Sequence, residues 1–277
     1  VFLLIFLKYR VFLIESAIQP KHFEKYRNNE DDLNNPFDNL LMPDLCYPIY
    51  AVGDVYGQLS QLEAALIAIE KDGGKDAAVV FIGDLVDRGA DSRRVIELII
   101  SLCDEGRNFT ILKGNHDRMF EWFMESPPRH DPHLLVGMDW FHGRLGGRET
   151  MASYGIEIDE RRRLFEVHKE AVEKVPQAHV DFLKSLKIKH LISDKLFVHA
   201  GIRPDVPLDQ QSEDDLLWIR EDFHAHQDFH SHLVIHGHTA IDSPTHYGNR
   251  INLDGGAGYG RPLVPMIIEG RQMRPLL

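Results

Sequence analysis

Five side chains of types that bind metal ions each follow directly after a short apolar segment. Asp54, Asp84, Asn115, His199 and either His236 or His238 offer carboxylate, amide and imidazole donors. This mixture of oxygen and nitrogen ligands suits Mn, Fe, Zn or similar divalent ions. Two such ions about 3.5–4 Å apart can clamp a phosphoryl oxygen and lower the pKa of a bridging water. Holding such a pair together requires a shared carboxylate, and Asp84 is the natural bridge.

The segments before these residues predict buried strands that would bring them together. They are short, apolar and contain β-branched residues, and they lie at 49–52, 77–82, 109–112, 195–198 and 233–235. Amphipathic stretches separate several of them. We expect Ser60 to cap a helix that carries Leu62, Leu66 and Ile69, and Ser92 to open another. The alternation predicts an α/β domain, in which ligands collect at the carboxyl ends of the strands.

The remaining parts of the chain fit around this domain. Apolar runs at 251–253 and 266–268, near Gly-rich turns, predict a mixed or second sheet. A helical insertion at about 127–189 could cap the site; it contains Trp140 and Arg144, to which no spacing assigns a role. Residues 1–46 read as an extension and linker before a domain at 47–277. The apolar runs at 1–7 and 11–14 are too short to span a bilayer, which takes roughly 20 residues.

Composition narrows the class of function. The formal net charge of -12 disfavours binding to nucleic acid or anionic membranes, which needs a basic surface. It does not exclude an anionic substrate at a metal. The two cysteines cannot build a disulfide framework, so we expect a reducing, cytoplasmic setting. The histidines at 224, 226, 230, 232 and 246 are expected to be solvated. Sequence alone leaves the oligomeric state open.

Five segments resemble the motifs of a known family. They read GDVYG (53–57), GDLVDRG (83–89), GNHD (114–117), HAG (199–201) and HGHT (236–239). In this order they resemble the calcineurin-like metallophosphoesterases, and more narrowly the phosphoprotein phosphatases. Residues 146–155, FVHAGIRP and Trp218-Ile219-Arg220 are similar to bacterial members, including relatives of symmetrical diadenosine tetraphosphatases. The resemblance implies an α/β fold of two facing sheets with flanking helices and a helical cap insertion.

The resemblance also implies a role for each site residue. Asp54 would bind the first metal, Asp84 would bridge both metals, and Asn115, His199 and His238 would bind the second. His116 would be the general acid that protonates the leaving oxygen, oriented by Asp87. Arg88 and Arg220 would clamp phosphate, because a guanidinium matches phosphate oxygens with two hydrogen bonds. The implied cofactors are two divalent ions, with Mn first and Fe or Zn as alternatives.

Tyr56 departs from the family pattern, which has histidine at this position of the first motif. Three interpretations are open. The phenol could ligate the first metal as phenolate, for which its pKa must fall from about 10 by about three units, costing about 4 kcal/mol. It could turn aside or donate a hydrogen bond while water completes that metal's shell. In the third interpretation the first position is empty and the protein is a degraded enzyme.

The expected function is hydrolysis of a phosphoric ester. We expect phosphorylated Ser or Thr on proteins as the first substrate class, with a dinucleoside polyphosphate or nucleotide as the alternative. A further alternative, of another class, is a non-catalytic protein that binds phosphorylated ligands because Tyr56 impairs its metal site. Expected partners are therefore a phosphoprotein or a phosphorylated small molecule, with neither nucleic acid nor stable membrane insertion.

Overall fold

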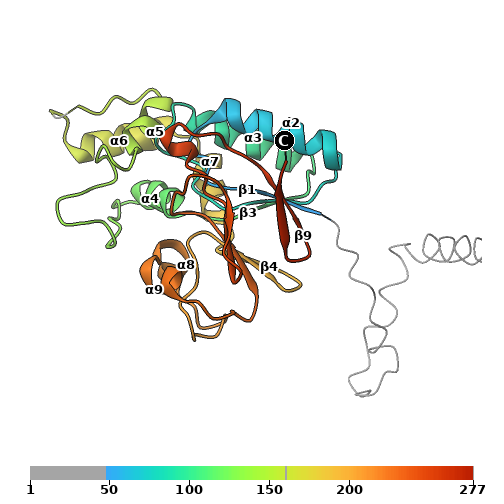
Figure 1. Cartoon of the computed structure of the whole chain (residues 1–277). Helices are drawn as coiled ribbons and strands as arrows, with labels where there is room; N and C mark the ends of the chain where they lie inside the picture. The colour runs from blue at the N-terminus through green and yellow to red at the C-terminus, as the bar shows by residue number, and fades with distance from the viewer. Residues whose placement is uncertain (1–47, 160, 277) are drawn as a thin grey trace, which may run out of the picture. The chain divides into compact units, whose positions relative to one another are not determined.

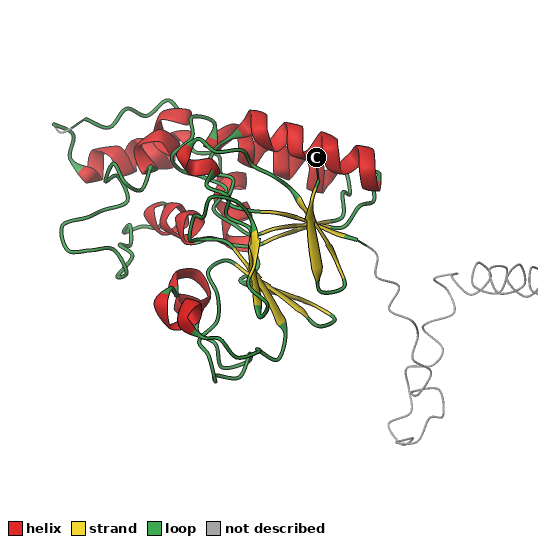
Figure 2. Ribbon diagram, viewed as in Figure 1, coloured by secondary structure: helices red, strands yellow, loops and turns green. Residues whose placement is uncertain are grey.

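Two five-stranded sheets form the centre of the domain. The structure, a computed structural model, describes residues 48–159 and 161–276. The first sheet has the order β10-β9-β1-β2-β3, and the second has the order β4-β5-β6-β8-β7. The strands are β1 (Ile49–Val52), β2 (Val79–Phe81), β3 (Phe109–Ile111), β4 (Lys189–Ile192), β5 (Lys195–Val198), β6 (Leu233–His236), β7 (Thr245–His246), β8 (Arg250–Asn252), β9 (Met266–Glu269) and β10 (Gln272–Pro275). Both sheets are mixed (Figure 2). Strands β1, β2 and β3 run parallel up to one edge of the first sheet, and β5, β6 and β8 run parallel in the middle of the second.

Helices cover the outer faces of both sheets. The longer ones, α2 and α3, lie along the first sheet, and the short pair α8 and α9 lies beyond the second sheet (Figure 1). The helices are α2 (Leu59–Gly73), α3 (Ser92–Asp104), α4 (Asn115–Phe123), α5 (Gly147–Ser153), α6 (Leu164–Lys174), α7 (Gln177–Ser185), α8 (Glu213–Trp218), α9 (Glu221–Ala225) and the 3-10 helix η3 (Ala257–Tyr259). The prediction of a two-sheet sandwich with flanking helices is confirmed.

Side-chain alternation along the strands creates separate apolar layers. In β1, Ile49 and Ala51 face the second sheet, where they share a cluster with Phe197 and Ile235. Tyr50 belongs instead to the cluster under the helices. Because successive strand residues point to opposite faces, a continuously apolar strand is expected where both faces are covered. The sheets therefore lie in the interior, and their carboxyl ends can hold polar groups in a fixed frame.

One helix start differs from the prediction. Helix α2 begins at Leu59 after Gln58, so Ser60 lies inside the helix and does not cap it. The Leu62 amide donates to the Gln58 carbonyl, and the entry to the helix is set by a tight turn in which Tyr56 and Gly57 both have positive φ. A backbone turn at the motif thus replaces the side-chain cap. Helix α3 does begin at Ser92, as predicted.

The segment 127–189 contains helices only from residue 147 onward. Residues 124–146 form turns and irregular chain, after which come α5, α6 and α7. Helix α5 contacts α3, and α7 contacts α3 and α4. The predicted extension at 1–46 falls outside the described residues. Within 48–159 and 161–276, none of the helices has the length and apolar character needed to cross a bilayer.

The histidine-rich segment is less exposed than predicted. His224, His226 and His230 are half-buried, and the rings of His224 and His230 pack against Phe223. His226 stacks on His230, with 4.8 Å between ring centroids. The segment is therefore partly solvated, because Phe223 supplies an apolar surface that some of the imidazole rings cover.

These buried imidazoles predict acid sensitivity. Burial lowers the pKa of His179, His224 and His230 below the usual 6.5. The unfolded chain therefore binds protons at a higher pH than the folded chain does, so stability is full above about pH 6.5 and falls as the pH drops below it. We expect the free energy of unfolding of metal-free protein in urea to be lower at about pH 5.5 than at about pH 7.5.

A paired substitution tests this source of acid sensitivity. A variant with His224→Gln and His230→Gln should lose less stability than the natural chain over the same change in pH. An unchanged slope in that variant would contradict the assignment.

Candidate metal centre and active site

Strand ends from both sheets bring the predicted ligands together. Asp54 and Asp84 follow β1 and β2 of the first sheet, and His199 and His238 follow β5 and β6 of the second. Asn115, the first residue of α4, lies between the two imidazoles. Its Oδ1 is 2.9 Å from Nε2 of His199 and 2.8 Å from Nδ1 of His238. Asp54 accepts the backbone N–H of His238 at 3.1 Å, which joins the two sheets at the site.

The backbone is unusual where it carries these residues. Asp84, Asp87 and His238 have φ values of 50°, 75° and 67°, in the left-handed region that favours glycine. Two glycines allow the backbone to pass close to the carboxylates of the site. A β-carbon at Gly114 would overlap the Asp84 carboxylate, and one at Gly237 would overlap the Asp54 carboxylate. The motif glycines are therefore needed for space around the two carboxylates.

The electrostatics of the cluster suit a cation. Burial, with the nearby charges of Asp254 and Asp84, raises the pKa of Asp54 well above its usual value. Burial alone would also raise the pKa of Asp84, but interactions with His199 and His116 lower it. Burial lowers the pKa of both His199 and His238, so both imidazoles are neutral, the form that ligates metals. Buried carboxylates that repel one another are stabilised by a cation placed among them.

The donor atoms of the second-metal set fit a divalent ion. Ligand atoms of Asp84, His199 and His238 all lie within 4.8 Å of one another, and Asn115 touches both imidazoles. The Nε2 atom of His238 is buried and has no hydrogen-bond partner in the structure. An oxygen and nitrogen donor set of this kind suits Mn, Fe or Zn. The residues present therefore fit the predicted metal.

The predicted ligands of the first metal differ from the family pattern, because Tyr56 stands where that pattern has a histidine. Its buried hydroxyl donates a hydrogen bond to Oδ2 of Asp84 at 2.7 Å. Burial and the charges of Asp84 and Asp54 raise the pKa of Tyr56 well above 10, which favours the neutral phenol. The hydrogen bond to Asp84 is one feature of the second interpretation, and the role of Tyr56 at the metal stays a prediction.

Asp254 is a further buried carboxylate near Asp54 and Asp84, and sequence analysis did not identify it. It follows β8, its Oδ1 accepts the Gly256 amide at 2.9 Å, and its buried Oδ2 has no hydrogen-bond partner among the described residues. Burial and the charge of Asp84 raise the pKa of Asp254 to about 6. Its Gly-rich surroundings are typical of a turn, so the sequence does not indicate that Asp254 belongs to the site. With Asp54 and Asp84 it makes this end of the sheets acidic.

His116, the predicted general acid, contacts Asp87, and Asp87 is itself held by further hydrogen bonds. Nδ1 of His116 lies 2.6 Å from Oδ2 of Asp87. That same oxygen accepts the indole N–H of Trp140 at 2.8 Å, and Oδ1 accepts the hydroxyl of Thr150 at 2.6 Å. Trp140 and Thr150 both belong to the 127–189 segment. Thr150 falls in the stretch similar to bacterial family members, whereas nothing in the spacing of Trp140 indicated this contact.

The contact between Trp140 and Asp87 predicts a measurable effect on turnover. Hydrogen bonds to charged groups contribute about 1.5–3 kcal/mol, and only part of that would reach the transition state through His116. We expect Trp140→Phe to lower kcat by about tenfold with little change in KM or metal content. Trp122→Phe is a matched control, since Trp122 stacks with Arg118 and Arg129 and has no contact with Asp87. Equal losses in both variants would contradict this role.

An open cavity of about 380 Å³ lies over the cluster. Three arginines line it: Arg88, Arg220 and Arg261. Nη2 of Arg88 is 3.5 Å from Nε2 of His116, and Arg220 donates to Oγ1 of Thr239 at 2.9 Å. The structure thus brings both predicted arginines to the same cavity as His116. Arg261 and Tyr259, which also line it, were not identified from sequence.

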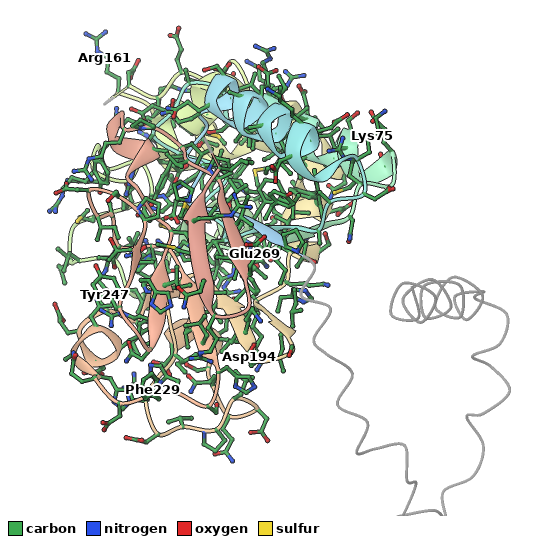
Figure 3. All side chains as sticks on the ribbon, turned by 45° about the vertical axis from the view of Figure 1, so that its right-hand side comes forward. Lys75, Arg161, Asp194, Phe229, Tyr247 and Glu269 are labelled. Atoms are coloured by element: carbon green, nitrogen blue, oxygen red, sulfur yellow. The ribbon has the colours of Figure 1, made fainter. Side chains whose placement is uncertain are left out.

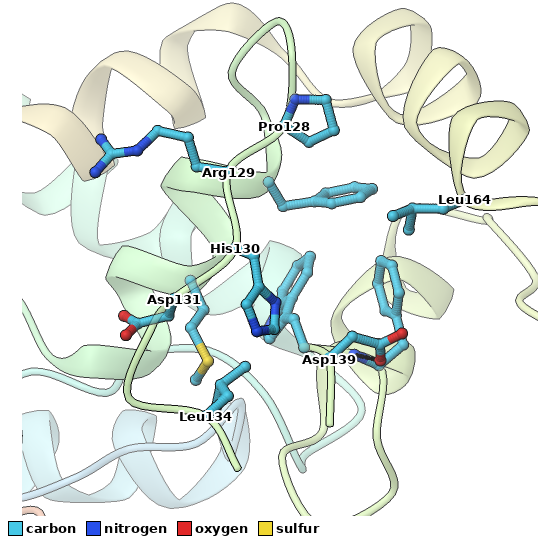
Figure 4. Close-up of a pocket in the computed structure, with 11 residues that line it drawn as sticks. Pro128, Arg129, His130, Asp131, Leu134, Asp139 and Leu164 are labelled. Carbon is cyan, nitrogen blue, oxygen red and sulfur yellow. Dashed lines mark hydrogen bonds between the residues drawn. The ribbon is translucent and has the colours of Figure 1, made fainter. Parts of the chain in front are cut away.

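A smaller cavity of about 80 Å³ lies behind the Trp140 indole. Its lining includes Phe123, His130, Leu134 and Asp139, all from α4 or the irregular chain after it (Figure 4). The indole of Trp140 also stacks on Phe120, with 5.3 Å between the ring centroids. Packing around this cavity therefore fixes the indole that contacts Asp87.

Comparison with known proteins identifies the family. A sequence model described as calcineurin-like phosphoesterase matches residues 47–254. The chain belongs to this family. The predicted resemblance to calcineurin-like metallophosphoesterases is therefore confirmed.

Relatives of this phosphoesterase share part of its sequence. It is 31% identical to a symmetrical bis(5'-nucleosyl)-tetraphosphatase of Acidovorax sp. over 156 residues, covering 56% of this chain and 44% of that protein. It is 26% identical to the protein of the same description from Nitrosospira multiformis, covering 58% and 46% of the two chains. The phosphoesterase thus spans less than half the length of these curated relatives.

Solved structures share its fold. One, of a protein provisionally assigned as a diadenosine tetraphosphatase, has a TM-score of 0.59 and 21% identity, covering 84% of this chain and 95% of that one. A cold-active protein-tyrosine phosphatase of a Shewanella species has a TM-score of 0.52 and 15% identity, covering 83% and 80%. At these identities the likeness concerns the fold alone.

Proposed function

We propose that this chain is a metal-dependent hydrolase of phosphate esters or anhydrides. One observation carries the proposal. A single cavity is lined by His116, which contacts Asp87, by His238 of the buried cluster of metal-type ligands, and by three arginines. Such a cavity offers each of the groups that hydrolysis of a phosphate bond needs: a proton donor, cation sites and donors to phosphate oxygens.

The residues would divide the chemistry as follows. Asp54, Asp84, Asn115, His199 and His238 would hold the metals, with Asp84 between them. Bound divalent ions would supply Lewis acidity toward the phosphate and the attacking water.

The other side chains would act on the substrate directly. Arg88 and Arg220 would bind phosphate oxygens, because a planar guanidinium donates two parallel hydrogen bonds. His116, protonated, would give the proton on Nε2 to the leaving oxygen, while Asp87 holds the proton on Nδ1 and stabilises the imidazolium.

We place dinucleoside polyphosphates ahead of phosphoproteins as the substrate class. Three guanidinium groups line the cavity. A phosphate monoester carries only about −1.5 to −2 charge at neutral pH, so three cations suit a chain of several phosphates better. The names of the sequence relatives point the same way. Phosphorylated Ser or Thr on proteins remains the second candidate, favoured by the open form of the cavity and the resemblance of the motifs.

A comparison of substrates tests the proposal. Metal-free protein is loaded with Mn²⁺, Fe²⁺ or Zn²⁺ and given diadenosine tetraphosphate, a phosphoserine peptide or p-nitrophenyl phosphate. We expect turnover with at least one metal and the highest kcat/KM on the tetraphosphate. Asp84→Asn should lose both metal and activity. Bound metal without turnover of any substrate would overturn hydrolysis and favour a phospho-ligand binder. A higher kcat/KM on the peptide would reverse the order of substrates.

A further inference from the structure

Arg88 lies between two tyrosine rings. Its guanidinium carbon is 4.0 Å from the ring centroid of Tyr56 and 4.6 Å from that of Tyr259. Its Nη2 atom reaches Nε2 of His116, while its Nε atom is buried and has no hydrogen-bond partner in the structure. A guanidinium over an aromatic face is attracted by the ring quadrupole. The two rings therefore fix the plane of a side chain that hydrogen bonds leave only partly constrained.

Tyr56 is itself held on several sides. Its hydroxyl donates to Asp84, and its ring meets His116 edge-on with 5.1 Å between centroids. Gly258 of η3 packs directly on the ring, so a β-carbon there would overlap both Tyr56 and the Arg88 side chain. The second tyrosine follows at once in the same short helix. Tyr259 is 62% exposed at the rim, so Arg88 has one buried ring beneath it and one ring open to the cavity.

This arrangement points to a role for Tyr56 that does not depend on metal ligation. An arginine side chain loses rotamer freedom when it is fixed, and stacking fixes it before substrate arrives. A pre-oriented guanidinium loses less on binding phosphate. Phenol oxygen is a poorer ligand than imidazole when neutral, but a tyrosine has the ring face needed for stacking.

We propose that Tyr56 is a positioning residue for Arg88, which it holds with Tyr259 in the orientation that receives a substrate phosphate. This role rests on the proposed function, because it assigns Arg88 to phosphate. It gives a reason for a tyrosine at a position where the family pattern has histidine, while the rest of the motif is kept.

Phosphate binding, separated from turnover, tests this role. Inorganic phosphate is titrated calorimetrically into Mn²⁺-loaded protein, and bound metal is measured by elemental analysis in the same samples. We expect Tyr259→Leu to weaken phosphate binding by about 2- to 30-fold, the range of cation–π contributions, without loss of metal. Tyr259 is exposed, so this variant should fold. Tyr56→Leu should weaken binding at least as much, whereas Tyr56→Phe, which keeps the ring, should keep most of the affinity.

Tyr56→His separates the two functions of the position. We expect the imidazole to increase Mn²⁺ affinity while phosphate binding at saturating metal becomes weaker. If Tyr56→Phe instead loses one equivalent of metal and phosphate binding falls only for that reason, the phenol is a ligand and the positioning role is overturned.

The chain contains a matched control for stacking in general. The guanidinium of Arg250 lies 4.2 Å from the ring centroid of Tyr247, which is 46% exposed and is not among the residues lining this cavity (Figure 3). Tyr247→Leu should leave phosphate affinity unchanged. In an Arg88→Lys background, Tyr259→Leu should have a smaller effect than in the natural chain.

Three outcomes would overturn the inference. The first is unchanged phosphate affinity in Tyr259→Leu with metal retained. The second is a loss of phosphate affinity in Tyr247→Leu equal to that in Tyr259→Leu. The third is an equal effect of Tyr259→Leu in the natural chain and in the Arg88→Lys background. A natural chain that binds phosphate but hydrolyses no substrate would overturn the proposed function while leaving the stacking role supported. No phosphate binding at all would overturn both.

Discussion

Replacing His116 with asparagine lowers kcat by about 10²–10⁴-fold while the protein keeps its metal. This expectation follows from the 2.6 Å contact between Nδ1 of His116 and Asp87 and from the position of His116 in the lining of the cavity beside Arg88. General acid catalysis contributes about 10²–10⁴ to a rate, and asparagine cannot donate a proton to a leaving oxygen. Steady-state kinetics with Mn²⁺ and elemental analysis of the same protein make the measurement.

The leaving group supplies the internal control for this substitution. A substrate such as p-nitrophenyl phosphate, whose leaving oxygen needs little protonation, should lose much less rate than an alkyl phosphate ester. If both substrates lose the same factor, or if the variant loses metal in proportion to activity, His116 has a structural role and the assignment of general acid is wrong.

The second large effect concerns stability and the packing of the 127–189 segment. Asp131 is fully buried and accepts from Nη2 of Arg118 at 2.9 Å and from the indole of Trp218 at 3.3 Å. The Arg118 side chain is only 2% exposed. We expect Asp131→Ala to lower the free energy of unfolding by about 3–5 kcal/mol, because it leaves a guanidinium buried without this carboxylate. Urea denaturation at neutral pH measures the change.

A neighbouring carboxylate on the same arginine is the matched control. Asp214 accepts from Nη1 of Arg118 at 2.7 Å, but its side chain is 52% exposed. Asp214→Ala should change stability by only about 0–1 kcal/mol, because water screens an exposed ion pair. Similar changes in the two variants would show that burial does not decide the strength of this network.

The site residues that can be predicted from the sequence are those that follow a recognisable apolar run. Apolar runs end at Asp54, Asp84 and His199, and strand ends in an α/β sheet meet at one edge, so convergence could be expected before any coordinates. The start of α2 could not be predicted in the same way, because Ser60 satisfies the preference for a cap while the backbone turn at Tyr56 determines where the helix begins.

The residues that contact Asp87 or line the cavity around the site cannot be recognised from a local sequence pattern. Trp140 and Thr150 reach Asp87 across 53 and 63 residues of sequence. Trp140 comes from irregular chain, where no period of 2 or 3.6 fixes the direction of a side chain. Thr150 lies in the short helix α5, too short for a periodic pattern to identify it. Tyr259 and Arg261 line the cavity from a Gly-rich turn that reads only as a turn. Such residues are identified by three-dimensional contact, and their roles in catalysis stay predictions.

The left-handed backbone of the motif loops has a consequence for engineering this protein. Five non-glycine residues of the site have positive φ: Tyr56, Asp84, Asp87, Arg88 and His238. Each such conformation costs of order 1 kcal/mol relative to glycine. A search for variants with a higher melting temperature should therefore favour glycine or asparagine at these positions, and the variants that it enriches should be those least able to bind metal or phosphate. Thermal selection on this scaffold needs a simultaneous selection for activity.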